Sequence, residues 1–384
     1  MSQVNSYPFI LVHGFLCWGS ESELDKKVPT FGMWNANAKK ALQEKGYQAE
    51  TPHVGPFSGM WDRACMLYAR IKGGRVDYGK VHSARGGYPR FGETYPGLVP
   101  NWGELDDEGK IQKINLIGHS FGGPTVRTLI NLLAEGSEEE REGTDPDDLS
   151  PLFAGGKQEW VHSCVTLAAT HNGVTLPDAM SSVVMNTMAA GFYGIANCAS
   201  GTKLARIYDF SLDRFGFTSK TEHIKPQPKK IVELLKRKEN NIYWELSTEG
   251  GSTLTKDYKT YDNIYYFSYS GRRTWTWHGL ELPTKKMFGL LKPFSILEGR
   301  YKDAEHGVDW RPNDGLVNVE CARHPKNEPY VEYQEGMDIK PGIWHVMPTE
   351  DKDHVSYMGI GEKEQTYNDF FTEIAERICS LPTI

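Results

Sequence analysis

The chain has 384 residues, with 43 basic and 50 acidic side chains and a net charge of −7. This length exceeds the size at which single hydrophobic cores usually stop growing, so we expect one domain enlarged by insertions. The mild acidic balance and the lack of a long basic run argue against nucleic acid as a partner. No run of eighteen apolar residues occurs, so we expect no membrane-spanning helix.

Six cysteines are scattered along the chain without the CxxC spacing of a zinc ribbon or of a dense disulfide framework: 17, 65, 164, 198, 321 and 379. Polar residues and then a short apolar run open the sequence, without the long apolar segment of a signal peptide. A secreted protein without its leader would begin in the same way. The residues alone therefore leave localisation open.

The first predicted strand, Pro8–Phe15, ends in His13-Gly14-Phe15. A step from strand to loop at this place can present a backbone amide that stabilises an oxyanion, and the amide of Phe15 is our candidate. We expect His13 to be a structural hydrogen-bonding residue.

Helical and strand patterns then alternate: a helix over Phe31–Lys45, a strand over Tyr47–Val54 and a helix from Trp61 to Gly73. The segment from Val76 to Pro100 is rich in Gly, Tyr and Pro and is predicted to be irregular. Loops of this length usually carry function or are tied down by other groups.

The centre of the sequence is residues 113–123, where an apolar strand is followed at once by Gly118-His-Ser120-Phe-Gly122 and then by a helical pattern. Strand, sharp turn and helix with serine at the apex form the nucleophile elbow of an α/β-hydrolase. The two glycines permit a turn in which a Cβ would clash. Ser120 is therefore the predicted nucleophile, and the amide of Phe121 is the second predicted oxyanion donor.

Beyond the elbow, residues 135–148 are strongly acidic and are predicted to be solvated helix and loop with no site. A strand is predicted over Trp160–Leu167. The segment Leu176–Ala199 is rich in Met, Val, Ala and Phe and lies outside the strand–helix alternation, which favours a lid helix over a core helix. Lys229–Lys238 is amphipathic and could form the other half of the lid.

A last strand, Asn263–Ser270, and a C-terminal helix, Asp369–Leu381, complete the pattern. The alternation predicts an α/β-hydrolase fold, with a mostly parallel central sheet and helices on both faces. We expect a single domain over residues 1–384. A lid insertion is expected at 174–240, and loop-rich insertions are expected at 61–100 and 240–280.

The catalytic triad of this fold follows the order serine, acid, histidine. His354 lies in a late loop before the final helix, and Asp314 lies in an Asn-Asp-Gly turn, so this pair is the first choice. A carboxylate fixes the imidazole, and the imidazole takes the serine proton. The alternatives that the residues leave open are Asp309 and Asp353 for the acid and His345 for the base.

At this point the chain resembles the bacterial family I.5 lipases, the thermoalkalophilic Bacillus-type and staphylococcal lipases. The similar stretches cover nearly the whole chain and include Gly118 to Gly123. The pieces specific to the family are Val76-Asp-Tyr-Gly79 and Trp310-Arg-Pro-Asn-Asp-Gly-Leu-Val317. The resemblance implies a secreted triacylglycerol lipase with a double-helix lid, working at an oil–water interface. It assigns the triad to Ser120, Asp314 and His354 and the oxyanion amides to Phe15 and Phe121.

The family also holds a structural zinc with two aspartates and two histidines, which makes the 61–100 and 240–280 insertions a possible zinc subdomain. Asp62 and His82 match the first ligand of each kind. Glu245 stands in place of the second aspartate, and Tyr88 in place of the second histidine. Glutamate is an acceptable oxygen ligand, but tyrosine is a poor substitute for imidazole, so zinc is only one possible cofactor.

The family's calcium site departs further from the pattern. Ser356 and Gly361 occupy the positions of two acidic ligands, while Gly299 keeps a backbone carbonyl and Glu362 lies nearby. Calcium prefers six to eight oxygen ligands, including charged ones, so we expect no tight calcium site.

Two alternatives to the lipase hypothesis follow from the same residues. The first is a broad-specificity carboxylesterase, phospholipase or polyester hydrolase with the same machinery. The second is a non-catalytic lipid-binding protein on a hydrolase scaffold, which an intact set of candidate residues disfavours.

Overall fold

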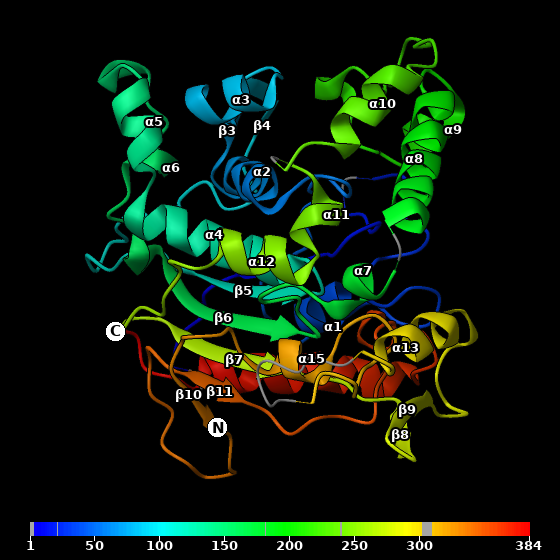
Figure 1. Ribbon diagram of the computed structural model, residues 1–384. Helices are drawn as coiled ribbons and strands as arrows, with labels where there is room; N and C mark the ends of the chain where they lie inside the picture. Colours follow the sequence, from blue (N-terminus) through cyan, green and yellow to red (C-terminus); the bar gives the residue numbers. More distant parts are fainter. Residues whose placement is uncertain (1–3, 21, 181, 239, 302–308) are drawn as a thin grey trace.

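The computed structural model describes residues 4–20, 22–180, 182–238, 240–301 and 309–384 (Figure 1). At its centre lies a seven-stranded sheet in which every neighbouring pair is parallel. The order across the sheet is β10 (Tyr330–Glu332), β11 (Trp344–Val346), β7 (Tyr265–Tyr269), β6 (Val161–Leu167), β5 (Ile114–His119), β1 (Phe9–Val12) and β2 (Ala49–Glu50).

Helices cover both faces of this sheet, and alternate residues of each strand point into different cores. In β1, Ile10 and Val12 face the core under α2 (Met60–Lys72) and α4 (Gly122–Glu135). Phe9 and Leu11 face the core under α1 (Ala38–Glu44) and α15 (Glu364–Cys379). This three-layer arrangement confirms the predicted α/β-hydrolase fold.

The strand register brings the predicted catalytic loops to one edge. Val12 of β1 pairs with Gly118 of β5, and His119 pairs with Leu167 of β6. The loops that follow these strands therefore begin side by side at the carboxyl edge of the sheet, where parallel sheets bind ligands.

The prediction that the segment 76–100 is irregular was wrong. It contains an antiparallel pair, β3 (Gly74–Asp77) and β4 (Phe91–Tyr95), with α3 (Lys80–Gly86) between the two strands. Buried Tyr78 and Tyr88 join this small sheet to the main hydrophobic core, which the Gly- and Tyr-rich composition concealed. The 240–280 segment is likewise ordered, as α11 (Ile242–Glu245), α12 (Thr248–Leu254), β7 and β8 (Thr274–Trp277).

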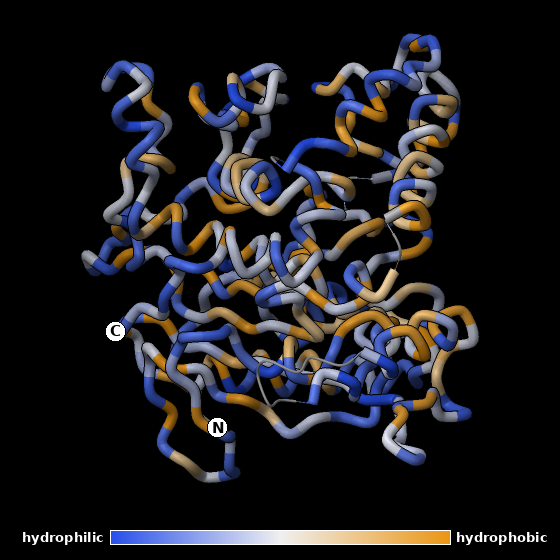
Figure 2. Tube along the Cα trace, viewed as in Figure 1, coloured by the Kyte–Doolittle hydropathy of each residue, from blue (hydrophilic) through white to orange (hydrophobic). Residues whose placement is uncertain are grey.

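The acidic stretch 135–148 also differs from its prediction. It forms α5 (Glu138–Gly143), blue along its length in Figure 2, but Glu140 within it is only 1% exposed. The Glu140 carboxylate accepts the backbone N–H groups of Val81 (3.1 Å) and His82 (2.7 Å). A carboxylate at this position caps the N-terminus of α3, so the acidic stretch holds the small sheet in place.

The predicted lid segment forms four helices in place of two, namely α7 (Thr175–Ala179), α8 (Ser182–Ala199), α9 (Lys203–Ile207) and α10 (Pro228–Leu235). Residues 181 and 239 of this range lie outside the described residues. Helices α8 and α10 pack against each other above the sheet (Figure 1).

The remaining elements are short. The β8 strand pairs with β9 in a hairpin beside α13, and α14 follows the turn that carries Asp314. Their bounds are β9 (Leu280–Pro283), α13 (Lys292–Glu298), α14 (Val319–Arg323), α6 (Pro151–Ala154), η1 (Pro146–Asp148), η2 (Gln158–Trp160), η3 (Asp213–Phe215), η4 (Gly289–Leu291) and η5 (Ser356–Met358).

All six cysteines are free thiols in the structure. None of the helices in the described ranges combines the length and apolar character that crossing a bilayer would require.

Candidate active site

Ser120 stands at the apex of the turn between β5 and α4, with a φ of +56°. This left-handed conformation is strained for serine, and the elbow is built around it. A Cβ on Gly118 would lie 2.5 Å from the carbonyl oxygen of Gly122, and one on Gly122 would lie 2.2 Å from that of Val12. The two glycines of the motif are therefore needed because backbone passes where their side chains would be.

The predicted oxyanion donors flank this serine. A Cβ on Gly14 would lie 2.8 Å from the Cβ of Ser120, so the loop that carries Phe15 runs directly against the serine. Phe121 is the N-cap of α4 and is fully buried. In the described part of the chain, neither the Phe15 nor the Phe121 amide donates to a backbone carbonyl. Both N–H groups are thus available to a ligand oxygen.

Asp314 and His354 are joined by a hydrogen bond of 2.9 Å from the imidazole Nδ1 to the carboxylate Oδ2. The other carboxylate oxygen of Asp314 accepts the backbone N–H groups of Leu316 (3.0 Å) and Val317 (2.8 Å). The backbone N–H of His354 donates to the carbonyl oxygen of Asp314 at 3.0 Å. Acid and base are therefore oriented by their own loops before any substrate binds.

The loop that carries His354 also lies against the elbow. The rings of His119 and His354 have centroids 4.8 Å apart, and His119 Nε2 hydrogen-bonds the carbonyl oxygen of His354 at 3.2 Å. His119 directly precedes Ser120, so one side chain links the nucleophile turn to the base. Burial lowers the pKa of His119 far below its usual value, which keeps this link neutral.

The alternative acids and base are engaged elsewhere. Asp309 pairs with Arg311 at 2.6 Å. Asp353 accepts the N–H groups of Phe288 (2.8 Å) and Ser356 (3.0 Å) and so holds its own loop. His345 lies within β11, and its Nδ1 hydrogen-bonds the carbonyl of Tyr266 at 3.1 Å. The structure thus brings Asp314 and His354 together and engages these three residues in other contacts.

The buried guanidinium of Arg63, which sequence reasoning missed, is linked by hydrogen bonds to both predicted oxyanion loops. The fully buried Arg63 donates to the carbonyl oxygen of His13, to Gly55 O (2.9 Å) and to Thr125 Oγ1 (2.8 Å). Thr125 Oγ1 in turn donates to the carbonyl oxygen of Phe121 at 2.8 Å. Desolvation lowers the pKa of Arg63 to about 9, so the guanidinium stays charged at neutral pH. Its position next to Asp62 in an apolar helix gave no functional signal.

Helix α8 extends toward this site. Its Phe192 ring packs edge-on against that of Phe15, with centroids 6.2 Å apart, while Ala189 and Tyr193 enter the main core. Other apolar side chains on α8 are open to solvent, including Val183 (72% exposed) and Ile195 (57%). Figure 2 shows hydrophobic segments along the whole helix. The helix therefore has apolar residues on two sides, one packed on the site and one free.

Asp62, the first of the predicted zinc ligands, pairs with the guanidinium of Arg214. Asp62 is fully buried, and its Oδ2 lies 2.5 Å from Nη2 of Arg214, while Oδ1 accepts the Tyr88 hydroxyl (3.1 Å) and faces His82 Nε2 (3.3 Å). Burial alone would raise the pKa of Asp62, but the Arg214 charge outweighs it and the pKa is lowered. Glu245 turns away to accept the Met60 N–H at 2.6 Å.

These residues do not fit a zinc ion, because both Asp62 oxygens are already paired and Glu245 is engaged with backbone. No group of three or more ligating side chains in the described ranges is arranged to hold a metal. Arg214 lies against the rings of Tyr78 (4.3 Å) and Phe215 (4.7 Å), and its Nε and Nη1 have no hydrogen-bond partner among the described residues. Nothing in the local sequence Leu-Asp-Arg-Phe indicated this role for Arg214.

The calcium positions are also engaged. The carbonyl oxygen of Gly299 accepts the Glu281 N–H at 3.2 Å, Ser356 Oγ donates to Asp353 at 3.0 Å, and Glu362 lies 3.8 Å from Arg273.

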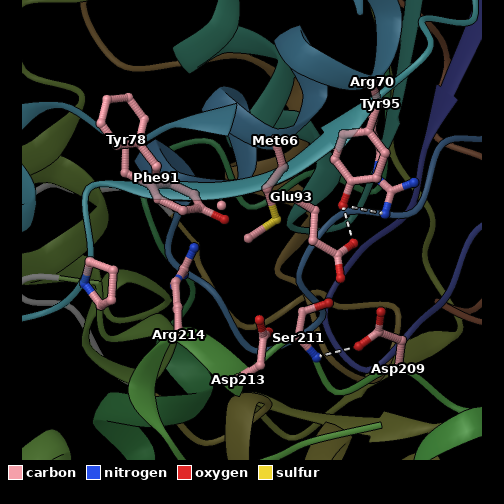
Figure 3. Close-up of a pocket in the computed structure, with 12 residues that line it drawn as sticks. Met66, Arg70, Tyr78, Phe91, Glu93, Tyr95, Asp209, Ser211, Asp213 and Arg214 are labelled. Carbon is pink, nitrogen blue, oxygen red and sulfur yellow. Dashed lines mark hydrogen bonds between the residues drawn. The ribbon is translucent and has the colours of Figure 1, made fainter. Parts of the chain in front are cut away.

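Figure 3 shows a pocket of about 310 Å³ on the outer side of Arg214, whose side chain extends toward Tyr78 and Phe91. Its lining comes from α2, from β4 and from residues 209–214. None of the candidate catalytic residues lines it, so the pocket is separate from the predicted catalytic site.

Comparisons with known proteins agree with this geometry. A family model described as "Lipase-like, C-terminal domain" matches residues 5–381. A lipase of Staphylococcus epidermidis is 36% identical over 372 residues, covering 92% of this chain and 50% of the relative. The chain thus spans about half the length of the curated relatives it matches.

Two solved structures are similar over nearly their whole length. The Staphylococcus hyicus lipase has a TM-score of 0.85 at 29% identity, with 98% of this chain and 96% of that chain covered. Lipase 1 from Pelosinus fermentans has a TM-score of 0.80 at 39% identity, with 98% and 99% covered. This chain belongs to the staphylococcal-type, lipase-like family of α/β-hydrolases.

Proposed function

We propose that the chain is a serine ester hydrolase of the triacylglycerol lipase type, which cleaves fatty-acyl esters through an acyl-enzyme. The observation that carries the proposal is the oriented Asp314–His354 pair held against an elbow that presents Ser120 beside two unused backbone amides. Each part of the machinery for acyl transfer is supplied by this chain's own residues.

In the proposed reaction, Ser120 Oγ attacks the ester carbonyl carbon while His354 Nε2 takes the hydroxyl proton. The carbonyl oxygen becomes an oxyanion and accepts the N–H groups of Phe15 and Phe121. Asp314 stabilises the imidazolium and holds its Nδ1 proton. The tetrahedral intermediate expels the alcohol, which receives the proton from His354, and leaves an acyl group on Ser120. Water, deprotonated by His354, then releases the fatty acid.

The lid supports a lipid substrate in preference to a soluble one. Four apolar side chains of helix α8 are exposed to solvent: Val183, Val184, Met188 and Ile195. An exposed apolar patch of this kind favours contact with an apolar phase. We propose that this side of the lid lies on the oil surface during turnover. Similarity to the staphylococcal lipases supports an extracellular place of action.

A graded ester series, from four- to eighteen-carbon acyl chains, tests the proposal. Wild type and Ser120→Ala are compared on emulsions and on the same esters below their solubility limit. Cleavage of long-chain emulsions by wild type only is the expected result. Turnover confined to soluble short esters would replace the lipase by a general carboxylesterase. Failure of Ser120 to react with an organophosphonate would overturn catalysis altogether.

A further inference from the structure

The β8–β9 hairpin exposes an apolar face to solvent and buries a charged residue on its other face. Trp275 and Trp277 are 48% and 51% exposed, and their partners across the hairpin are Leu282 and Leu280. Because side chains alternate along a strand, these four apolar residues share one face of the hairpin. The opposite face carries Glu281, which is only 1% exposed. Soluble two-stranded sheets normally bury the apolar face and expose the charge.

The orientation of the hairpin is fixed by polar contacts. Glu281 Oε1 accepts Nη2 of Arg272 at 2.9 Å and the hydroxyl of Thr276. The Glu281 backbone N–H donates to the carbonyl oxygen of Gly299 at 3.2 Å, and Arg311 donates to the carbonyl oxygen of Gly279 in the turn. These contacts of Glu281 and Gly279 fix which face of the hairpin carries the tryptophans outward.

Basic side chains outnumber carboxylates in the hairpin and the segment after it. Between residues 272 and 300 the only carboxylates are those of Glu281 and Glu298, and both are buried. The basic residues of the same stretch are Arg272, Arg273, Lys285, Lys286, Lys292 and Arg300, in a chain of net charge −7. Arg272 pairs with Glu281 (2.9 Å), and Arg273 (2.9 Å) and Lys286 (2.5 Å) both pair with Asp351.

More apolar surface adjoins the hairpin. Phe288 and Leu290, which follow β9, are 38% and 73% exposed. The Phe288 N–H donates to Asp353 at 2.8 Å, next to His354, and the Arg273 N–H donates to the carbonyl of Asn313 at 3.2 Å, next to Asp314. The surface is thus bonded to both catalytic loops. Figure 1 places the hairpin and α13 on the side toward which β6 and β7 point.

We propose that the outer face of this hairpin, together with Phe288, Leu290 and Lys285, is a second docking surface that binds a lipid–water interface charged with ionised fatty acids. The inference rests on the proposed function, because ester cleavage releases the carboxylates that accumulate at the oil surface. Tryptophan rings settle at the boundary between apolar and polar phases. Lysine and arginine beside them attract anionic surfaces. The acidic remainder of the chain would otherwise be repelled by its own product.

The test uses the full chain with Ser120→Ala, so that binding is read without hydrolysis. Its partition onto phosphatidylcholine vesicles with and without oleate is measured by flotation at alkaline pH, where oleate is ionised. We expect oleate to tighten binding at least about ten-fold and added salt to remove that gain, because salt screens charge at a surface. Trp275→Ser with Trp277→Ser should weaken binding to both vesicles by about ten-fold or more.

Matched variants make the outcome decisive. Trp34→Ser removes a tryptophan that is 72% exposed at another place and should leave binding within about two-fold. Lys285→Glu should abolish the oleate gain, whereas Lys256→Glu, also exposed, should keep it. Binding of the double tryptophan variant at the wild-type level would overturn the proposal. Hydrolysis of a soluble short ester, measured with Ser120 intact, reports the proposed function separately and should be unchanged in every hairpin variant.

Discussion

The ring of Phe192 on α8 packs edge-on against the ring of Phe15, whose backbone amide is the proposed oxyanion donor, with centroids 6.2 Å apart. Phe57 contacts both rings, at 5.6 Å from Phe15 and 6.0 Å from Phe192. The lid and the oxyanion loop therefore share one aromatic cluster. A displacement of α8 would change the packing of Phe15, the proposed oxyanion donor.

Phe192→Ala should lower kcat on a soluble short ester about ten-fold, because the cavity it leaves frees the Phe15 loop. Met188→Ala, on the exposed side of the same helix, is the control and should leave soluble-ester kcat unchanged. Steady-state kinetics on both variants provide the measurement. Equal kcat in wild type and Phe192→Ala would show that the aromatic contact does not govern the oxyanion loop.

Arg63→Lys should reduce kcat by about 10² with little change in KM, because a lysine cannot hold His13 O, Gly55 O and Thr125 at once. An enzyme that is only destabilised would instead have a lower melting temperature and would recover full kcat at low temperature. Arg85→Lys, at an exposed pair with Glu139, serves as the control. An unchanged kcat for Arg63→Lys would remove Arg63 from the oxyanion architecture.

Arg214→Met should lower the free energy of unfolding by about 3–5 kcal/mol, because it leaves the Asp62 carboxylate buried without its countercharge. Adding Asp62→Asn to the Arg214→Met variant should restore part of the loss. Denaturant unfolding of the wild type, the two single variants and the double variant measures the coupling energy between Asp62 and Arg214. The wild-type protein should contain no stoichiometric zinc, and a chelator should leave its melting temperature unchanged. A stoichiometric zinc ion and a chelator-sensitive melting temperature would contradict this expectation.

Acid should weaken the contact between Asn5 near the N-terminus and His162 of β6. His162 Nε2 accepts the amide N–H of Asn5 at 3.1 Å, and burial lowers the pKa of His162 from 6.5 to about 4. A lowered histidine pKa means that the unfolded chain binds protons first, so stability is lost as pH falls from about 6.5 to 4. At about 1.4 kcal/mol for each pH unit, the loss at pH 4 is roughly 3 kcal/mol.

His162→Gln, which keeps an acceptor for Asn5, should flatten this dependence. Denaturant unfolding at pH 4, 5.5 and 7 measures the slope for both proteins. The other buried histidines with lowered pKa, His13, His119, His171 and His345, should leave a residual slope in the variant. Parallel curves for the two proteins would show that His162 does not carry the acid sensitivity.

The sequence predicted those parts of the site that local backbone determines. The spacing of Gly118, Ser120 and Gly122 encodes the elbow, because the turn admits no Cβ at either glycine. Asp314 and His354 followed from chain order and loop context. The residues alone left Asp309 and Asp353 as competing acids, the family resemblance favoured Asp314, and the hydrogen-bond partners in the structure agree with that choice.

Partnerships between distant segments were missed. Arg214 and Asp62 are far apart in the chain, and neither neighbourhood carries a pattern that specifies the pairing. The same holds for Glu140, whose acidic surroundings predicted solvent while its carboxylate caps α3. Burial of a charge depends on what the rest of the fold brings to it, and periodicity in one segment contains no such information.

The countercharge of Asp62 is a covalent part of the polypeptide. Long-chain fatty acids form insoluble soaps with divalent metal ions, so a droplet undergoing lipolysis becomes a sink for such ions as products accumulate. A guanidinium tethered to the backbone has no dissociation equilibrium with that sink. During the proposed lipase reaction, the ion pair between Asp62 and Arg214 would therefore not depend on the supply of metal ions.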